Sequence, residues 1–102
     1  MQYLVSIENR PYHHWQIDLL IESFKLKGFE DQLVVALAEH HGQKYKEFGR
    51  NLVGHKHVYR HQNYGRIRNL PGLNKAYSVA ALLANGKIRQ PFCLIEPDMI
   101  LP

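Results

Sequence analysis

Two acidic residues near the C-terminus, Glu96 and Asp98, are the side chains of this sequence best placed to hold a metal ion. They follow an apolar run, Phe92 to Ile95, that is typical of a strand buried in a parallel sheet. Pro97 lies between them and, having no N–H, should end the strand pairing. Carboxylates where a buried strand ends are costly unless they meet a cation or hydrogen-bond donors. Since Mg²⁺ often bridges carboxylates to phosphates, the pair predicts a metal that holds a nucleoside diphosphate. A polar turn after a core strand is the alternative.

A lysine at the start of a predicted helix is the second feature that favours a phosphate ligand. Asn74 has the position of an N-cap for a helix over 74–85, so Lys75 falls in the first turn. A cation there opposes the helix dipole, whereas a helix N-terminus and a lysine together bind phosphate. A lysine that faces solvent is the alternative.

Polar residues also follow the two strands predicted in the first half of the chain, at 2–7 and 32–38. Ligands of open α/β sheets bind at the carboxyl ends of parallel strands. The resulting candidates are Glu8, Asn9, Arg10 and Glu39. An ordinary solvated loop after the first strand is the alternative.

A parallel sheet with helices is needed to position these residues. The clearest helix covers 14–27 and ends at Gly28, and we expect Trp15 to pack it on the sheet. The order strand, helix, strand within about forty residues predicts a right-handed βαβ unit. With the helix over 74–85 and a last strand over 92–96, the predicted fold class is α/β: a Rossmann-like three-layer fold with a mostly parallel sheet.

The segment 42–72 is ambiguous. A short polar helix fits 43–48, and HKHVYRHQN is moderately β-like. Zinc binding by His55, His57 and His61 is disfavoured, because their spacing puts no three ligands on one face and no cysteine accompanies them. The loop 64–68 fits a nucleic-acid contact, a mobile loop near a phosphate, or a solvated loop. Neither a GxGxxG motif nor a P-loop is present.

Composition bounds the class of protein. The 102 residues predict one domain, 1–102, and a net charge of +4 suits an anionic ligand. Nucleic acid is a disfavoured partner, because the basic residues are spread along the chain. No stretch is long enough to span a membrane, there is no signal peptide, and Cys93 cannot form an internal disulfide. We therefore expect a cytoplasmic protein.

The segment LNKAYSVAALLANGKIRQPFCLIEPDMIL resembles the part of GT-A-fold glycosyltransferases that carries the Asp-x-Asp motif. It is most similar to the plant-type enzymes that glycosylate hydroxyproline or serine in peptides, in which Asn-Lys-Pro opens a helix and a buried strand leads into the motif. The N-terminal part, through DQLVVALAE, is similar to the start of the same fold. Glu96 stands in place of the first Asp of the motif, Pro97 in place of a small residue, and Ala76 in place of the family's Pro.

The resemblance implies a site for a nucleoside diphosphate sugar. Glu96 and Asp98 would bind a divalent metal, Mn²⁺ or Mg²⁺, together with the nucleotide sugar. Asn74 and Lys75 match the family's Asn-Lys. Glu8, Asn9 and Glu39 correspond by position alone to strand ends that meet the nucleotide.

The resemblance covers about the first half of such an enzyme, since the acceptor site and usually the catalytic base follow the motif. It implies a GT-A-like fold truncated after the acidic motif, and metal-assisted glycosyl transfer of which this chain is the donor-binding half. We expect either self-association or a missing C-terminal half, with apolar surface exposed near 99–101. No residue is assigned as catalytic base, and enzyme activity of the chain alone stays open. The alternative is a non-catalytic α/β binding or interaction module, a truncated or decayed glycosyltransferase half.

Overall fold

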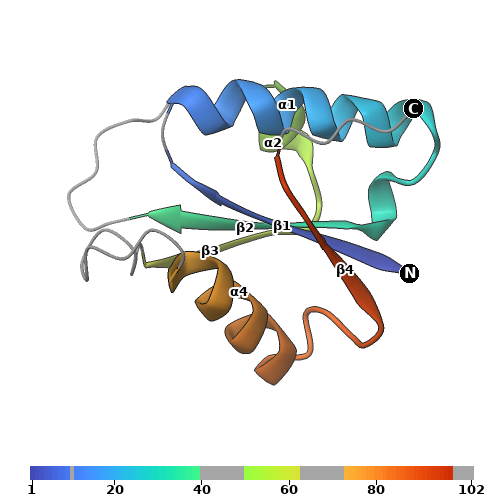
Figure 1. Ribbon diagram of the computed structural model, residues 1–102. Coiled ribbons are helices and arrows are strands. Elements are labelled where there is room, and N and C mark those ends of the chain that lie inside the picture. The colour runs from blue at the N-terminus through green and yellow to red at the C-terminus, as the bar shows by residue number, and fades with distance from the viewer. Residues whose placement is uncertain (10, 40–49, 63–72, 98–102) are drawn as a thin grey trace.

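The computed structural model describes residues 1–9, 11–39, 50–62 and 73–97. Strands and helices alternate along these residues (Figure 1). The strands are β1 (Gln2–Glu8), β2 (Leu33–Glu39), β3 (Val58–Gln62) and β4 (Phe92–Ile95). The helices are α1 (Pro11–Leu26), α2 (Arg50–Gly54) and α4 (Leu73–Ala84), with a 3₁₀ turn, η1 (Glu30–Gln32), before β2.

The four strands form a parallel sheet in the order β3-β2-β1-β4. In the register of β1, Tyr3 lies opposite Leu33 of β2 and Gln2 lies opposite Phe92 of β4. The prediction of an α/β fold with a parallel sheet is therefore confirmed, and the layout is Rossmann-like. The three strands predicted from sequence agree with the observed bounds to within one residue at each end.

β3 is a fourth strand, which the sequence left as an ambiguous β-like stretch. It pairs with β2 at the edge of the sheet, from Val58 opposite Val35 to Gln62 opposite Glu39. Each of its side chains is half-buried or exposed, whereas β2 is buried along nearly its whole length. An edge strand of this kind needs no continuous apolar run, and the sequence of β3 has none. The predicted short helix at 43–48 lies outside the described residues.

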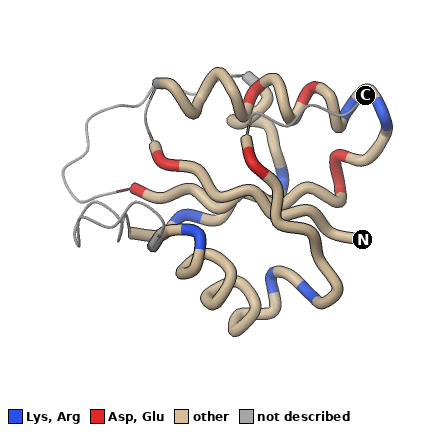
Figure 2. The backbone as a smooth tube through the Cα atoms, viewed as in Figure 1, with Lys and Arg blue, Asp and Glu red and all other residues tan. Residues whose placement is uncertain are grey.

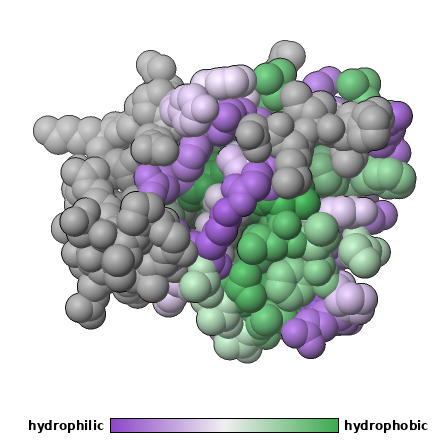
Figure 3. All heavy atoms as spheres, in the orientation of Figure 1, coloured by the Kyte–Doolittle hydropathy of each residue, from purple (hydrophilic) through white to green (hydrophobic). Residues whose placement is uncertain are grey.

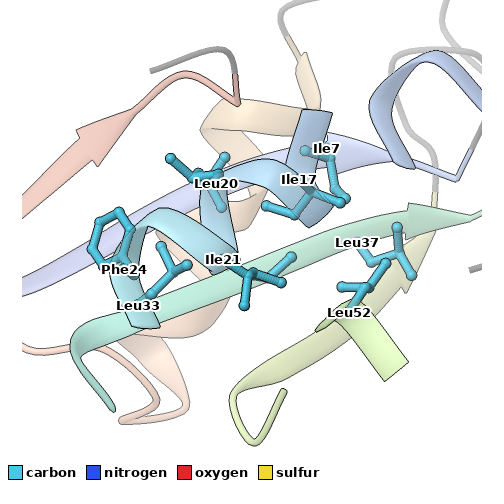
Figure 4. Close-up of a cluster of buried hydrophobic side chains, with 10 residues drawn as sticks. Ile7, Ile17, Leu20, Ile21, Phe24, Leu33, Leu37 and Leu52 are labelled. Atoms are coloured by element: carbon cyan, nitrogen blue, oxygen red, sulfur yellow. The ribbon is translucent and has the colours of Figure 1, made fainter. Parts of the chain in front are cut away.

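Helices cover both faces of the sheet. α1 and α2 lie on one face and α4 on the other, which gives three layers (Figure 1). The hydrophobic core on the α1 face contains Phe24, Ile17, Ile21 and Leu20 of the helix packed on strand residues (Figure 4). The smaller core on the α4 face consists of Leu4, Val34, Ala36, Leu82 and Ile88. In the space-filling view, hydrophobic residues gather over β4 and α4 (Figure 3).

Trp15 lies on the outer face of α1, with 54% of its surface exposed, so the prediction that it packs on the sheet is wrong. The buried residues Ile17, Leu20, Ile21 and Phe24 form one stripe along the helix. Residue 15 is about 200° around the helix from residue 17, because each residue turns by about 100°. The ring of Trp15 instead contacts Tyr12 edge-on, with 5.9 Å between ring centroids.

Both long helices end at a glycine with positive φ, as the sequence predicted for Gly28. Gly28 has φ 75° and Gly86 has φ 70°, a conformation in which a side chain is strained. Each helix closes with a Schellman motif, in which backbone N–H bonds run from Phe29 to Phe24 (2.8 Å) and from Lys87 to Leu82 (2.9 Å). These turns send the chain from each helix towards the amino end of the next strand.

Candidate functional site

The strand order reverses beside β1, which is the first strand of the sheet in sequence. β2 and β3 follow on one side of it, whereas β4 lies on its other side. A reversal of this kind is a topological switch point, and ligands of open α/β sheets bind outside the carboxyl ends of the strands that flank it. The topology therefore predicts a ligand site at the carboxyl ends of β1 and β4.

A pocket of about 300 Å³ lies at these strand ends. The end of β1, the first turns of α1 and α4, and the residues after β4 all contribute to it. Its lining residues are Ser6, Ile7, Glu8, His13, Asn74, Lys75, Glu96 and Pro97. Figure 2 shows the acidic residues at the ends of β1, β2 and β4, with a basic residue in the first turn of α4.

Four of the residues predicted for the site line this pocket: Glu8, Asn74, Lys75 and Glu96. They come from three segments that are far apart in the sequence. Two further candidates, Asp98 near the C-terminus and Arg10 after β1, lie outside the described residues.

The Lys75 ammonium forms an ion pair with Oε1 of Glu96 across the pocket. Both side chains are partly exposed, 39% for Lys75 and 47% for Glu96. Glu96 thus supplies the anion that compensates a lysine near the positive end of the α4 dipole. Sequence reasoning expected a bound phosphate in that role and did not foresee the pairing of these two residues.

His13 is a pocket residue that sequence reasoning missed. Its Nδ1 accepts a hydrogen bond from the backbone N–H of Glu8 at 2.9 Å. An accepting Nδ1 carries no proton, so this contact selects the neutral tautomer with hydrogen on Nε2. The imidazole is therefore uncharged while its Nδ1 accepts this bond.

Asn9 and Glu39 lie at the same sheet edge but do not line the pocket. The Asn9 side-chain amide donates to Oε1 of Glu39 at 3.4 Å, and Arg60 Nη1 donates to the same oxygen at 2.6 Å. The Oδ1 of Asn9 accepts from Nε2 of His14 at 2.7 Å. Burial and the neighbouring His13 lower the pKa of His14. This network ties the β1–α1 turn to β2 and β3, and so fixes one wall beside the pocket.

Ser6 connects the pocket to a partly buried chain of polar side chains on the α4 face. Its hydroxyl lies 3.0 Å from that of Ser78, which is fully buried, and Ser78 Oγ lies 2.7 Å from Nε2 of His61. Residues 6 and 78 are separated by 72 positions in the sequence. No sequence signal marked this chain, since each residue alone is an ordinary serine or histidine.

The pocket fits a hard divalent cation only together with other oxygen ligands. Two carboxylates line it in the described part of the chain, those of Glu8 and Glu96, and one oxygen of Glu96 already pairs with Lys75. Among the described residues, no group of three or more His, Cys, Asp or Glu could hold a metal ion. Mg²⁺ and Mn²⁺ commonly bind one or two carboxylates, with phosphate and water oxygens completing the shell.

The histidines weighed for zinc have separate partners. His55 Nε2 lies 2.7 Å from the carbonyl oxygen of Leu33, whereas His61 contacts Ser78. His57 has its ring 6.0 Å from that of His55. The loop at 64–68, weighed for a nucleic-acid contact, lies outside the described residues.

Comparisons of the chain with protein families, with curated proteins and with solved structures found no match. Within the described residues, no helix is both long enough and apolar enough to cross a membrane.

Proposed function

We propose that this pocket binds a nucleoside diphosphate sugar together with Mn²⁺ or Mg²⁺, as the donor site of a GT-A-type glycosyltransferase. The observation that carries the proposal is the meeting of Lys75, Glu96 and Glu8 in one pocket at the topological switch point. The resemblance to glycosyltransferases supplies the reaction class, and the pocket supports the diphosphate and the cation.

The charges of the lining residues favour coupled binding of metal and nucleotide. Glu8 and Glu96 bring two carboxylates to the pocket, and Lys75 brings one ammonium group. A diphosphate alone would meet more negative than positive charge, and a cation alone would find too few ligands. Each should therefore bind well only in the presence of the other.

Lys75 would change partners when the nucleotide binds. In the structure its ammonium pairs with Glu96, and it stands in the first turn of α4, where backbone N–H groups also attract phosphate. A diphosphate would take over the lysine, which frees the Glu96 oxygen for the cation. Asp98 would add a second carboxylate from the acidic motif.

The cation would supply Lewis-acid neutralisation of the diphosphate leaving group. Lys75 would hold a phosphate oxygen. Glu8 and Glu96 would fix the position of the diphosphate through the cation. No residue of this chain is assigned as the acceptor base.

A non-catalytic binding module is the second candidate. The closed Lys75–Glu96 pair favours it, because this pair satisfies both charges without a ligand. Such a module would keep the fold and the pocket, yet would bind no nucleotide in a metal-dependent way.

Calorimetric titration separates the two candidates. We expect UDP or GDP to bind the wild type in the presence of Mn²⁺ and to bind far more weakly without it. Asp98→Asn removes one charge with little change of shape, so it should abolish the coupled binding. Asp31→Asn is the matched control, since Asp31 is exposed and pairs with Lys56 at 3.8 Å, outside the lining of the pocket. Metal-independent binding, or no binding by folded protein, would reject the donor site.

A further inference from the structure

A hydrogen-bonded chain runs from the pocket wall to β3; it is buried at Ser6 and Ser78, partly buried at His61 and exposed at Gln62. Its links are Ser6 Oγ to Ser78 Oγ at 3.0 Å, Ser78 Oγ to His61 Nε2 at 2.7 Å, and His61 Nδ1 to the carbonyl oxygen of Gln62 at 2.8 Å. Ser78 is fully buried and Ser6 is nearly so, whereas Ser6 also lines the pocket. The chain therefore links a pocket residue to the titratable ring of His61 through Ser78.

The carbonyl oxygen of Gln62, at one end of this series of hydrogen bonds, determines the direction of all the others. A carbonyl oxygen can only accept, so His61 Nδ1 carries a hydrogen and donates it to Gln62. In a neutral imidazole Nε2 then has a lone pair, and the Ser78 hydroxyl donates to it. Ser78 Oγ in turn accepts the hydroxyl hydrogen of Ser6. With its hydrogen used in this way, Ser6 has only lone pairs left for a ligand.

We propose that Ser6 is a pH-gated ligand-binding residue of the pocket, whose hydroxyl is held as an acceptor by neutral His61 and becomes a donor when His61 is protonated. A protonated Nε2 must donate to Ser78 Oγ. The Ser78 hydroxyl hydrogen is displaced from the imidazole and turns to Ser6, so the Ser6 hydrogen becomes available to the pocket. Phosphate oxygens accept hydrogen bonds only, and they gain a partner in this second state.

The surroundings of His61 keep the acceptor state dominant at neutral pH. Burial lowers the pKa of His61 below its usual 6.5, although the bond to the Gln62 carbonyl acts in the opposite direction. Among the described residues, Tyr77 of α4 is the titratable side chain in ring contact with it, at 5.1 Å between centroids. The β2 residue opposite His61 is Ala38, which carries no charge. The reversal should therefore occur below pH 6.5.

The first test needs no ligand. Long-range proton–nitrogen NMR correlations on the whole chain should show His61 with its hydrogen on Nδ1 at pH 7.5. Ser78→Ala removes the donor that stabilises the neutral ring, so the pKa of His61 should rise in this variant. A hydrogen on Nε2 at pH 7.5, or a pKa that is unchanged by Ser78→Ala, would overturn the proposed chain.

The second test rests on the proposed nucleotide site and measures UDP affinity with Mn²⁺ between pH 7.5 and 5.5. The ratio of wild-type affinity to that of His61→Gln cancels the titration of the phosphate itself. We expect this ratio to rise about 2- to 10-fold towards acid pH, the range for one hydrogen bond. When both proteins of this ratio also carry Ser6→Ala, the ratio should no longer rise towards acid pH. His55→Gln is the control, because burial also lowers the pKa of His55 but it bonds to Leu33 and lies outside this chain.

The outcomes distinguish this inference from the function on which it rests. Binding with a flat ratio would overturn the gate and leave the donor site standing. An absence of UDP binding at every pH would overturn the donor site and the gate together. A rise that persists in Ser6→Ala would assign the effect to the charge of His61 rather than to Ser6, and would also overturn the gate.

Discussion

The two faces of the sheet differ in what they bury. The α1 face holds a cluster of ten buried hydrophobic residues, whereas the cluster on the α4 face holds five. The α4 face adds the polar chain of Ser6, Ser78 and His61, which leads to the pocket. Since apolar burial contributes about 25 cal/mol per Å² and buried polar groups contribute little net stability, the α1 face should dominate the stability of the fold.

This difference places the candidate chemistry on the less apolar face. Lys75 and Asn74 begin α4, so the helix that covers the smaller core also supplies two residues of the pocket. α1 contributes mainly through its first turn, and the rest of the helix packs on the sheet. Changes on the two faces should therefore separate stability from binding.

The largest expected effect is on the α1 face. Phe24→Ala should lower the free energy of unfolding by about 3–5 kcal/mol, because a fully buried aromatic ring is lost and a cavity remains. Urea unfolding followed by circular dichroism measures the change. A loss below about 1 kcal/mol would contradict the view that this face carries the stability.

On the α4 face, Ser78→Ala should cost about 1–3 kcal/mol, since it leaves the buried Ser6 hydroxyl and the His61 ring without this partner. Ser23→Ala is the matched control on α1, because that hydroxyl bonds within its own helix to the Leu20 carbonyl. We expect the control to change stability by less than Ser78→Ala does. Equal effects of the two substitutions would argue against a contribution of the Ser6, Ser78 and His61 hydrogen bonds to stability.

Acid should destabilise the fold through three histidines. Burial lowers the pKa of His14, His55 and His61 in the folded protein, so the unfolded chain binds more protons as pH falls below 6.5. Their contribution to stability is present above pH 6.5 and is lost as pH falls through the lowered folded-state values. Unfolding midpoints in urea at pH 7.5 and 5.5 should show the decrease, and His61→Gln should make it smaller. A midpoint that rises towards pH 5.5 would contradict the sign.

Substituting Lys75 should separate binding from stability. Lys75→Met should change the free energy of unfolding by less than about 1 kcal/mol, because the partner Glu96 lies in a partly exposed ion pair. It should weaken UDP binding in the presence of Mn²⁺ by about 10- to 100-fold, the range for a hydrogen bond to a charged group. Lys56→Met, which removes an exposed lysine outside the pocket lining, serves as control and should leave binding unchanged.

The smallest effect should come from Trp15, despite its size. Trp15→Ala should change stability by no more than about 0.5 kcal/mol, because the ring is largely exposed and contacts Tyr12 on the outer face of α1. Phe24→Ala is the comparison, because it removes an aromatic ring from the buried side of the same helix. A loss of several kcal/mol would mean that the outer face of α1 also carries packing energy.

The sequence by itself determined the elements that depend on local pattern. Apolar runs at 33–38 and 92–95 become strands, and the glycines at 28 and 86 end the helices because their positive φ suits no other residue as well. The end of the first strand and the start of the helix over 74–85 could also be predicted, and Glu8 and Lys75 from these two places line one pocket in the structure. These features depend on the periodicity of neighbouring residues and on backbone sterics.

Tertiary structure alone decided which of these segments meet. The choice of β4 as the second neighbour of β1, the pairing of Lys75 with Glu96, and the bond from Ser6 to Ser78 join residues far apart in the sequence. β3 lies at the edge of the sheet and has no fully buried side chain, so its sequence lacks the apolar pattern that would predict a strand. The side of α1 that packs on the sheet does not include Trp15, which is exposed. Such choices follow from the packing of whole elements against each other, which compares free energies over the entire fold and leaves no trace in a local window of sequence.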